Sequence, residues 1–286
     1  LLTSLGPRRL LAVVKALFPQ LSDTVFYFPA DEFPGAAGLV ALTIDDGICR
    51  QKANASMLPQ VLEVLKSRSA TATFFVCADY VREGDLERIV AGGHELANHL
   101  VKDTEYTEAS EDELARALQK TDELLTPFHA AGARRWFRAP QGRLTRRIAS
   151  VVRSQNMTHA LGDSYAEDWA IPEPELVSSL YLRQVTTGSV AIMHMPERGF
   201  REHTLQSIDL FLEGLDAYGL RAVALGELER AATTGCRTVS GSTPCAIAPP
   251  TASSLGVARA PSNGGGALRG GASGWRNGGG VQASEK

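Results

Sequence analysis

Leu39-Val40-Ala41-Leu42-Thr43-Ile44-Asp45-Asp46-Gly47 is the stretch that decides the fold of this chain. Its first part is a short apolar run, which predicts a buried strand, and the glycine predicts a turn directly after it. Adjacent acids on their own often lie on a solvated surface. Two carboxylates at the end of a buried strand instead predict a site, because one can bind a metal while its neighbour acts as a base.

Strand-like and helix-like stretches alternate from this run to about residue 232. Strands are expected at 39–44, 71–77, 94–97, 136–138, 158–161, 190–193 and 220–225. Helices are expected at 52–66, 83–91, 110–125, 145–154, 173–182 and 201–218, with a short one after the last strand to about residue 232. Such alternation predicts an α/β protein with parallel strands and helices outside them. About seven strands without a glycine-rich nucleotide turn favour a barrel, whose site lies at the carboxyl ends of the strands.

Composition excludes several classes of protein. The 286 residues are 44% apolar and 21% charged, which fits one large or two small globular domains and excludes a wholly disordered or fibrous chain. A net charge of -3 gives no argument for a nucleic-acid partner. No apolar run approaches the roughly 18 residues of a spanning helix, so no membrane segment is expected. Four scattered cysteines exclude a disulfide scaffold and a four-cysteine zinc site.

The two ends are expected to differ from the middle, with a domain at 36–232. Residues 1–35 form an N-terminal extension, in which Arg8-Arg9 and the apolar residues after them read as an amphipathic helix, or alternatively as part of a secretion signal. Because residue 1 is Leu, we expect a fragment or a processed form. Residues 233–286 contain 12 of the 27 glycines, which predicts a disordered tail. Cys236 and Cys245 there are either a small disulfide loop or two free thiols.

A second polar cluster runs from His94 to Asp103. It nearly matches the zinc-protease pattern of two histidines four residues apart, but Asn98 stands at the second position and excludes that site. His99 and Asp103 are four apart, which places them on one face of a helical turn as a plausible metal pair. We expect His94 to be structural.

Three more polar clusters follow later strands. Arg138 precedes the turn Pro140-Gln141-Gly142, where a guanidinium can reach a carboxylate and a backbone N–H is exposed. Asp168-Trp169 follows the strand at 158–161, and His194 ends the strand at 190–193. Each cluster is weak evidence by itself, since a single histidine at a strand end is usually a buried structural residue.

Taken in order, the five clusters resemble those of the NodB-homology polysaccharide deacetylases, the family-four carbohydrate esterases, over about residues 38–228. That family has a distorted (β/α) barrel of seven or eight units. Its members remove acetyl groups, mostly N-acetyl, from chitin, peptidoglycan and related glycans, and sometimes O-acetyl groups from xylan. The resemblance implies an acetylated glycan as substrate, a divalent metal (zinc, or cobalt or another ion) as cofactor, and a secreted or cell-wall location. It leaves the oligomeric state open.

The resemblance also implies a role for each polar residue. Asp45 matches the base, His194 the acid, Arg138 the residue that orients the base, and Asp168 and Trp169 the partners of the acid. The metal ligands would be Asp46, His99 and Asp103, and the backbone N–H of Gln141 would help to hold the oxyanion.

The chain departs from the family pattern at three positions. Asp103 stands where His is usual, Ile48 where Pro is usual, and Gln141 where Tyr is common. Two carboxylates and one imidazole cancel the charge of the metal, which predicts a weaker Lewis acid and a preference for harder metals. Because Gln141 acts through its backbone, its change should alter substrate contacts more than chemistry.

Two other functions remain open. One is a catalytically silent, glycan-binding domain of the same fold, in which replacing Asp45 by Asn would leave binding intact. The other is a hydrolase of a non-peptide C–N bond in a small amide. A polymer needs an open channel beside Trp169, so the size of the groove there separates this hydrolase from a polysaccharide deacetylase.

Overall fold

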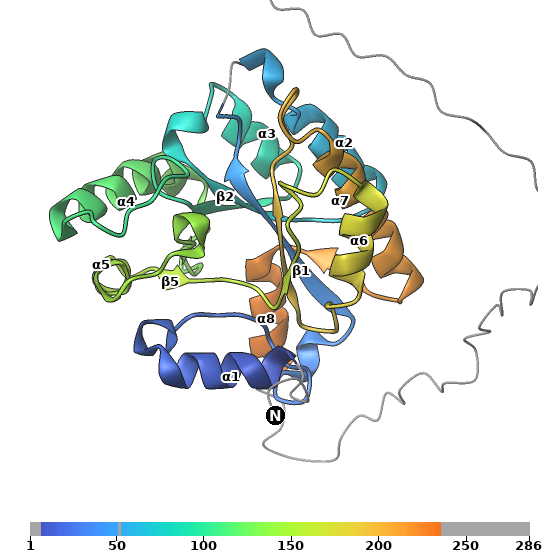
Figure 1. The fold of residues 1–286 in the computed structure, drawn as a ribbon, viewed down its shortest axis with the longest axis horizontal. Helices are drawn as coiled ribbons and strands as arrows, with labels where there is room; N and C mark the ends of the chain where they lie inside the picture. The colour runs from blue at the N-terminus through green and yellow to red at the C-terminus, as the bar shows by residue number, and fades with distance from the viewer. Residues whose placement is uncertain (1–6, 51–52, 236–286) are drawn as a thin grey trace, which may run out of the picture. The chain divides into compact units, whose positions relative to one another are not determined.

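The structure is a computed structural model that describes residues 7–50 and 53–235, and its centre is one curled parallel sheet (Figure 1). The strand order is β5-β4-β3-β2-β1-β7-β6, and β8 pairs with the first residues of β1. The strands of the described residues are β1 (Leu39–Gly47), β2 (Thr73–Val76), β3 (Glu95–Asn98), β4 (Trp136–Phe137), β5 (Thr158–His159), β6 (Ser164–Tyr165), β7 (Val190–His194) and β8 (Arg221–Val223).

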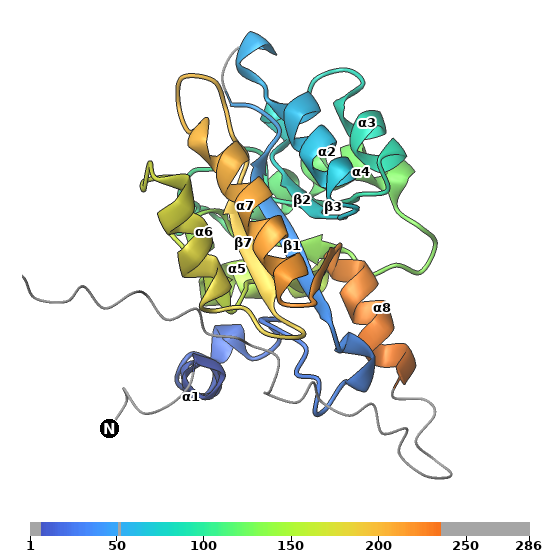
Figure 2. The ribbon, with the colours of Figure 1, turned by 90° about the vertical axis from the view of Figure 1, so that its right-hand side faces the viewer.

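Helices connect these strands and cover the outside of the sheet, where α6 and α7 pack side by side (Figure 2). They are α1 (Pro7–Leu17), α2 (Leu58–Ser67), α3 (Asp85–Ala91), α4 (Glu111–Leu125), α5 (Arg146–Ser154), α6 (Pro174–Leu182), α7 (His203–Ala217) and α8 (Leu225–Gly235). The predicted α/β barrel is confirmed as a half-barrel, because every strand pair is parallel and a helix follows each strand from β1 to β4 and from β6 to β8.

Side chains alternate between two buried faces of β1. Val40, Leu42 and Ile44 pack outward in the core under the helices. Ala41 points to the other side and packs in the barrel interior, where Trp136 fills much of the space. A strand buried on both faces reads as a continuous apolar run, which is why the sequence from residue 39 to 44 shows no polar alternation.

The half-barrel is open between β5 and β6, and the N-terminal segment spans this opening. Val25 pairs with Ala160 beside β5, and Tyr27 pairs with Ser189 beside β7. Near the same end, Arg8 of α1 donates a hydrogen bond to Asp163 at 3.0 Å. The N-terminal residues therefore close the side of the barrel that the sheet leaves unpaired.

Several predicted bounds were wrong. The expected strand at 158–161 ends at His159, and a short strand at Ser164–Tyr165 was not expected at all. The helix expected from residue 52 begins only at Leu58, after a short 3-10 turn, with a proline in its first turn.

The structure describes only the first three residues of the predicted tail. Helix α8 continues to Gly235, so residues 233–235 of the predicted tail are helical. The rest of that tail, and with it the question of a disulfide between Cys236 and Cys245, lies outside the described residues. The predicted division at residues 36 and 232 stays a prediction. Within residues 7–50 and 53–235, we find no helix with the length and apolarity that crossing a membrane requires.

Two buried histidines should make the fold sensitive to mild acid. Burial lowers the pKa of His159 to about 3 and that of His94 to about 4, so both stay neutral in the folded chain. A histidine of the unfolded chain titrates near 6.5, so stability is complete above that pH and falls below it, by about 1.4 kcal/mol per pH unit and histidine.

Urea unfolding should therefore give the wild type a smaller free energy of unfolding at pH 5.5 than at pH 7.5. In His159→Gln this decrease should be smaller by about 1 kcal/mol, because one of the two histidines is gone. The glutamine keeps a polar group beside Thr24, whose hydroxyl lies 3.0 Å from Nδ1 of His159. Equal losses in the two proteins would show that His159 is not the titrating group.

Candidate active site

One pocket of about 800 Å³ lies at the carboxyl ends of the strands. Of the nine predicted site residues, eight line it: Asp45, Asp46, His99, Asp103, Arg138, Gln141, Trp169 and His194. The ninth, Asp168, is fully buried and contacts His194. These residues come from distant parts of the chain, and parallel pairing brings them to the same edge of the sheet.

Asp45 is held by a buried arginine. Nη1 of Arg138 donates to Oδ1 of Asp45 at 2.5 Å and to the hydroxyl of Thr43 at 2.9 Å. Nε of the same guanidinium donates to the carbonyl of Ala160 at 2.9 Å, and its central carbon lies 3.9 Å from the ring centre of Phe75. The guanidinium is thereby fixed on several sides, so Asp45 is presented to the pocket in one orientation.

His194 is held by a buried carboxylate. Its Nδ1 lies 2.7 Å from Oδ1 of Asp168, and its backbone N–H donates to Oδ2 at 2.8 Å. Burial opposes protonation of His194, but the charge and hydrogen bond of Asp168 outweigh it and raise the pKa of the imidazole. Because Asp168 holds Nδ1, Nε2 is the nitrogen left to exchange a proton in the pocket.

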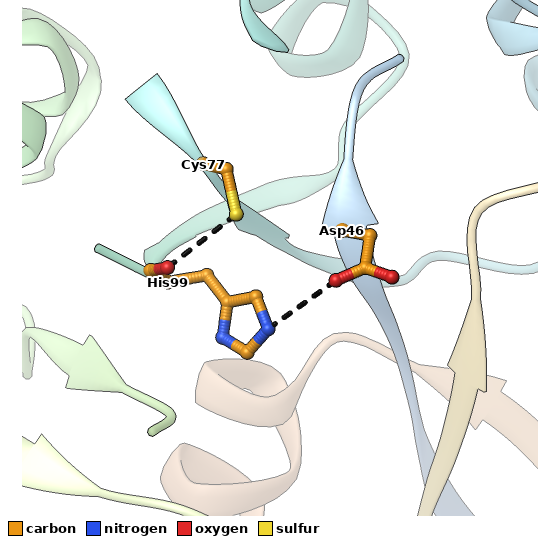
Figure 3. A group of neighbouring side chains, drawn as sticks. All are labelled: Asp46, Cys77 and His99. Atoms are coloured by element: carbon orange, nitrogen blue, oxygen red, sulfur yellow. Dashed lines mark hydrogen bonds and ion pairs between the residues drawn. The ribbon is translucent and has the colours of Figure 1, made fainter. Parts of the chain in front are cut away.

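Asp46, Cys77 and His99 form a group of potential metal ligands whose donor atoms all lie within 4.8 Å of one another (Figure 3). Nε2 of His99 lies 3.6 Å from Oδ1 of Asp46. Nδ1 of His99 lies 2.9 Å from the carbonyl oxygen of Arg138, which assigns the proton to Nδ1 and leaves Nε2 to face Asp46. A histidine whose second nitrogen donates to a carbonyl is typical of metal sites.

Asp46 and His99 fit a divalent metal. Two ligands of one tetrahedral zinc lie about 3.3 Å apart, close to the observed separation of their donor atoms. Burial acts to raise the pKa of Asp46, but the hydrogen bond of His99 and the charge of Arg201 lower it by more. The net pKa is therefore low, and this residue stays a carboxylate. Burial also opposes protonation of His99, yet Asp45 and Asp46 raise its pKa, so a metal would compete with a proton there.

Cys77 fits a metal less well. Its thiol is buried and donates to the backbone carbonyl of His99 at 3.4 Å. Burial, followed by the charge of Asp46, raises the pKa of Cys77 well above its usual value. Since the thiolate is the form that binds metals, this cysteine is a thiol contact beside the two better ligands.

Asp103 lies outside this close group, on the wall of the same pocket. Its Oδ2 is 3.7 Å from Nη2 of Arg50. Two guanidiniums instead contact Asp46: Arg50 donates to Oδ2 at 2.6 Å and Arg201 donates to the same oxygen at 2.7 Å. The assignment of Asp103 as the third ligand stays a prediction.

Sequence reasoning missed Arg50, Arg201 and Cys77. Cys77 directly follows β2 and Arg50 follows the turn after β1, so polar residues after strand ends were the available signal for both. Arg201 follows β7 by seven positions, and no spacing in the sequence relates it to Asp46.

Exposed aromatic rings form one side of the pocket. Trp169 and Phe200 are each about half exposed, and Nε1 of Trp169 donates to the hydroxyl of Tyr165 at 3.1 Å. Burial of the hydroxyl raises the pKa of Tyr165 to about 12, so it stays protonated as a donor to Glu167. Rings of this kind can stack on a flat apolar face of a ligand while their polar atoms stay wet.

Three non-glycine residues around the pocket have left-handed backbone. The φ angles are 59° at Asp46, 58° at Leu100 and 55° at Gln141. Such conformations cost roughly 1–3 kcal/mol each and persist where the surrounding structure imposes them. Leu100 and Gln141 come shortly after β3 and β4, and Asp46 is the last residue but one of β1, so the strain accompanies the turns at the carboxyl ends of these strands.

Comparison with known proteins shows what this chain is similar to. The family model for polysaccharide deacetylase matches residues 34–160, which contain β1 to β5. Residues 34–160 are thus similar to the polysaccharide deacetylase family. The matched range includes Asp45, Asp46, His99 and Arg138, while Asp168 and His194 lie after its end.

Two curated relatives carry names of this family. A chitooligosaccharide deacetylase of Sinorhizobium fredii is 24% identical over 63% of this chain and 86% of its own length. A peptidoglycan N-acetylglucosamine deacetylase of Listeria monocytogenes is 27% identical over 66% of this chain. The alignment covers 38% of the Listeria protein, so this chain matches only part of it.

A solved relative shows that the same fold exists without activity. A CE4 family pseudoenzyme of Bacillus anthracis is 25% identical, with a TM-score of 0.58 over 67% of this chain and 65% of that one. A mutant of it, described as having restored enzymatic activity, is 27% identical with the same TM-score and covers 67% of each chain. Activity of that protein therefore depends on individual residues as well as on the fold.

Proposed function

We propose that this chain is a metal-assisted hydrolase that removes acetyl groups, N-acetyl above all, from an acetylated polysaccharide such as chitin. The observation that carries the proposal is the pair of positioned groups in one pocket: Asp45 held by Arg138, and His194 held by Asp168. Asp45 and His194 are direct partners in the β1–β7 register, so a base and an acid face the same substrate. The similarity to the polysaccharide deacetylase family supports this reading.

In this mechanism Asp45 acts as the base. Its carboxylate accepts a proton from a water molecule as that water attacks the acetyl carbon. Arg138 is a positioning residue that holds the Asp45 carboxylate in place through a buried ion pair. The backbone N–H of Gln141, on the pocket rim, is the proposed donor to the oxyanion, a contact worth about 3–4 kcal/mol in comparable sites.

His194 acts as the acid. With Asp168 behind it, the imidazole is held protonated and can deliver its Nε2 proton to the leaving amine nitrogen. The half-exposed ring of Trp169 is the proposed stacking surface for a sugar.

Asp46 and His99 are the proposed metal ligands, with Asp103 as the third. When bound there, a divalent metal, zinc in our proposal, supplies the Lewis acidity that polarises the acetyl carbonyl and acidifies water. The chain itself orients His99 through the carbonyl of Arg138, which also presents the base, so ligand and base are positioned by one residue.

Acetate release from a short N-acetylglucosamine oligomer tests the proposal. We expect metal-stripped protein to lose at least about 100-fold of its activity and to regain it with Zn²⁺ or Co²⁺. An O-acetylated xylan assayed in parallel distinguishes N-acetyl from O-acetyl preference.

Failure would take two recognisable forms. Glycan binding without acetate release under any metal would favour the silent, glycan-binding alternative. Neither binding nor release would favour the hydrolase of a small amide, which can be assayed directly with cyclic amides.

A further inference from the structure

Arg50 contacts both carboxylates that we propose as metal ligands. Its Nη2 lies 2.6 Å from Oδ2 of Asp46 and 3.7 Å from Oδ2 of Asp103. Its Nε lies 3.4 Å from Oε1 of Glu197, which is fully buried. One guanidinium thus places a positive charge beside three acidic groups. A divalent metal bound by Asp46 and Asp103 would place its positive charge at the same position.

Aromatic rings accompany the Arg50 guanidinium at this place. Its central carbon is 5.1 Å from the ring centre of Phe200 and 6.0 Å from that of Tyr80. Cations are attracted to aromatic faces at such distances. The side chain is only about one-quarter exposed, so Arg50 belongs to the pocket wall and does not extend freely into solvent.

Charge balance separates Arg50 from Arg201. Asp46, Asp103 and Glu197 carry three negative charges, and the two arginines carry two positive ones. A divalent metal added to this group would leave one excess positive charge, whereas a metal in place of Arg50 would balance it. Arg201 is fully buried and also donates to the carbonyl of Met195 at 2.8 Å, whereas the Arg50 side chain is about one-quarter exposed and can move toward solvent.

Building on the proposed function, we propose that Arg50 is an internal cation that competes with the divalent metal for Asp46 and Asp103. In the metal-free protein it neutralises these carboxylates and keeps the site assembled. Metal binding requires that Arg50 release the carboxylates of Asp46 and Asp103. The apparent metal affinity is then the intrinsic affinity multiplied by the fraction of molecules in which Arg50 has moved away.

The test is metal binding by isothermal titration calorimetry with Zn²⁺ in the wild type and three variants. Arg50→Gln removes the competing charge and should bind zinc about tenfold more tightly or better. Arg50→Lys keeps the charge and should stay within about threefold of the wild type. Arg143→Gln is the matched control, because Arg143 lines the same pocket but pairs with exposed Glu105, and its affinity should stay within about twofold.

A second measurement uses the wild type and does not depend on the folding of a variant. The Nε–H signal of Arg50 in an NMR spectrum, assigned by its loss in Arg50→Lys, should shift on zinc addition as its contacts with Asp46 break. The signal of Arg143 should not shift. An Arg50 signal that is unchanged at zinc saturation would overturn the proposal.

The outcomes separate this proposal from the proposed function. Metal-dependent acetate release with equal zinc affinity in wild type and Arg50→Gln would overturn the competition and leave the function standing. Zinc binding by Arg50→Gln but not by the wild type would establish the competition and contradict a metal-assisted wild-type enzyme. Weaker binding by Arg50→Gln would show that Arg50 supports the metal, which also overturns the proposal.

Discussion

Asp45→Asn is expected to lower kcat/KM for acetate release by roughly 100- to 10 000-fold, the range that a positioned general base contributes. The amide is almost the same size as the carboxylate but cannot accept the proton of the attacking water. Its oxygen can still accept a hydrogen bond from Arg138, so the pocket should keep its shape. Steady-state kinetics on the N-acetylglucosamine oligomer measure this loss.

The structure supplies a matched control for this variant. Asp31→Asn makes the same chemical change at an exposed aspartate that is not part of the pocket, and it should leave kcat/KM unchanged. Glycan affinity of Asp45→Asn should stay near that of the wild type, because the change removes a proton acceptor and not a binding surface. Activity within about tenfold of the wild type would assign the base to another group.

His194→Asn is expected to cost roughly 100- to 10 000-fold on an N-acetyl substrate, but far less on an aryl acetate such as p-nitrophenyl acetate. An amine leaves only after it is protonated, whereas p-nitrophenolate is stable as an anion and needs no acid. The comparison of the two substrates isolates the proton transfer from any general damage to the site. Equal losses on both substrates would show that His194 is not the acid.

The pH profile offers an independent check on His194. Asp168 raises the pKa of this imidazole, so its acid form should persist above the ordinary value of about 6.5. Activity on the amide should therefore fall on the alkaline side of that pH, as the proton is lost. This alkaline limb should be absent from the residual activity of His194→Asn.

The sequence by itself determined the class of fold and the positions to search. A continuous apolar run before Asp45 predicts a strand buried on both faces, and β1 is such a strand at the centre of the sheet. The helix expected at 110–125 is Glu111–Leu125 in the structure, and the side chains of Ser110 and Glu113 form a capping box at its start. Because these signals are local, they can be read from neighbours in the chain.

Short strands were the least predictable elements. β5 and β6 have two residues each, and so few residues carry no periodicity that separates a strand from a turn. Their pairing is decided by the strands beside them, β4 and β7, which are distant in the sequence. For the same reason, the bridges of Val25 and Tyr27 across the open side of the barrel have no sequence signal.

At the site, the sequence named the residues that end strands, but only the tertiary structure decided which charges meet. Arg138 and Asp45 are both at strand ends, so their pairing could be expected from parallel topology. Arg50 and Arg201 reach Asp46 from two loops, and Glu197 lies buried beside Arg50. Guanidiniums on long side chains can reach several carboxylates, so their choice depends on distances in the folded chain, which spacing along the sequence does not contain.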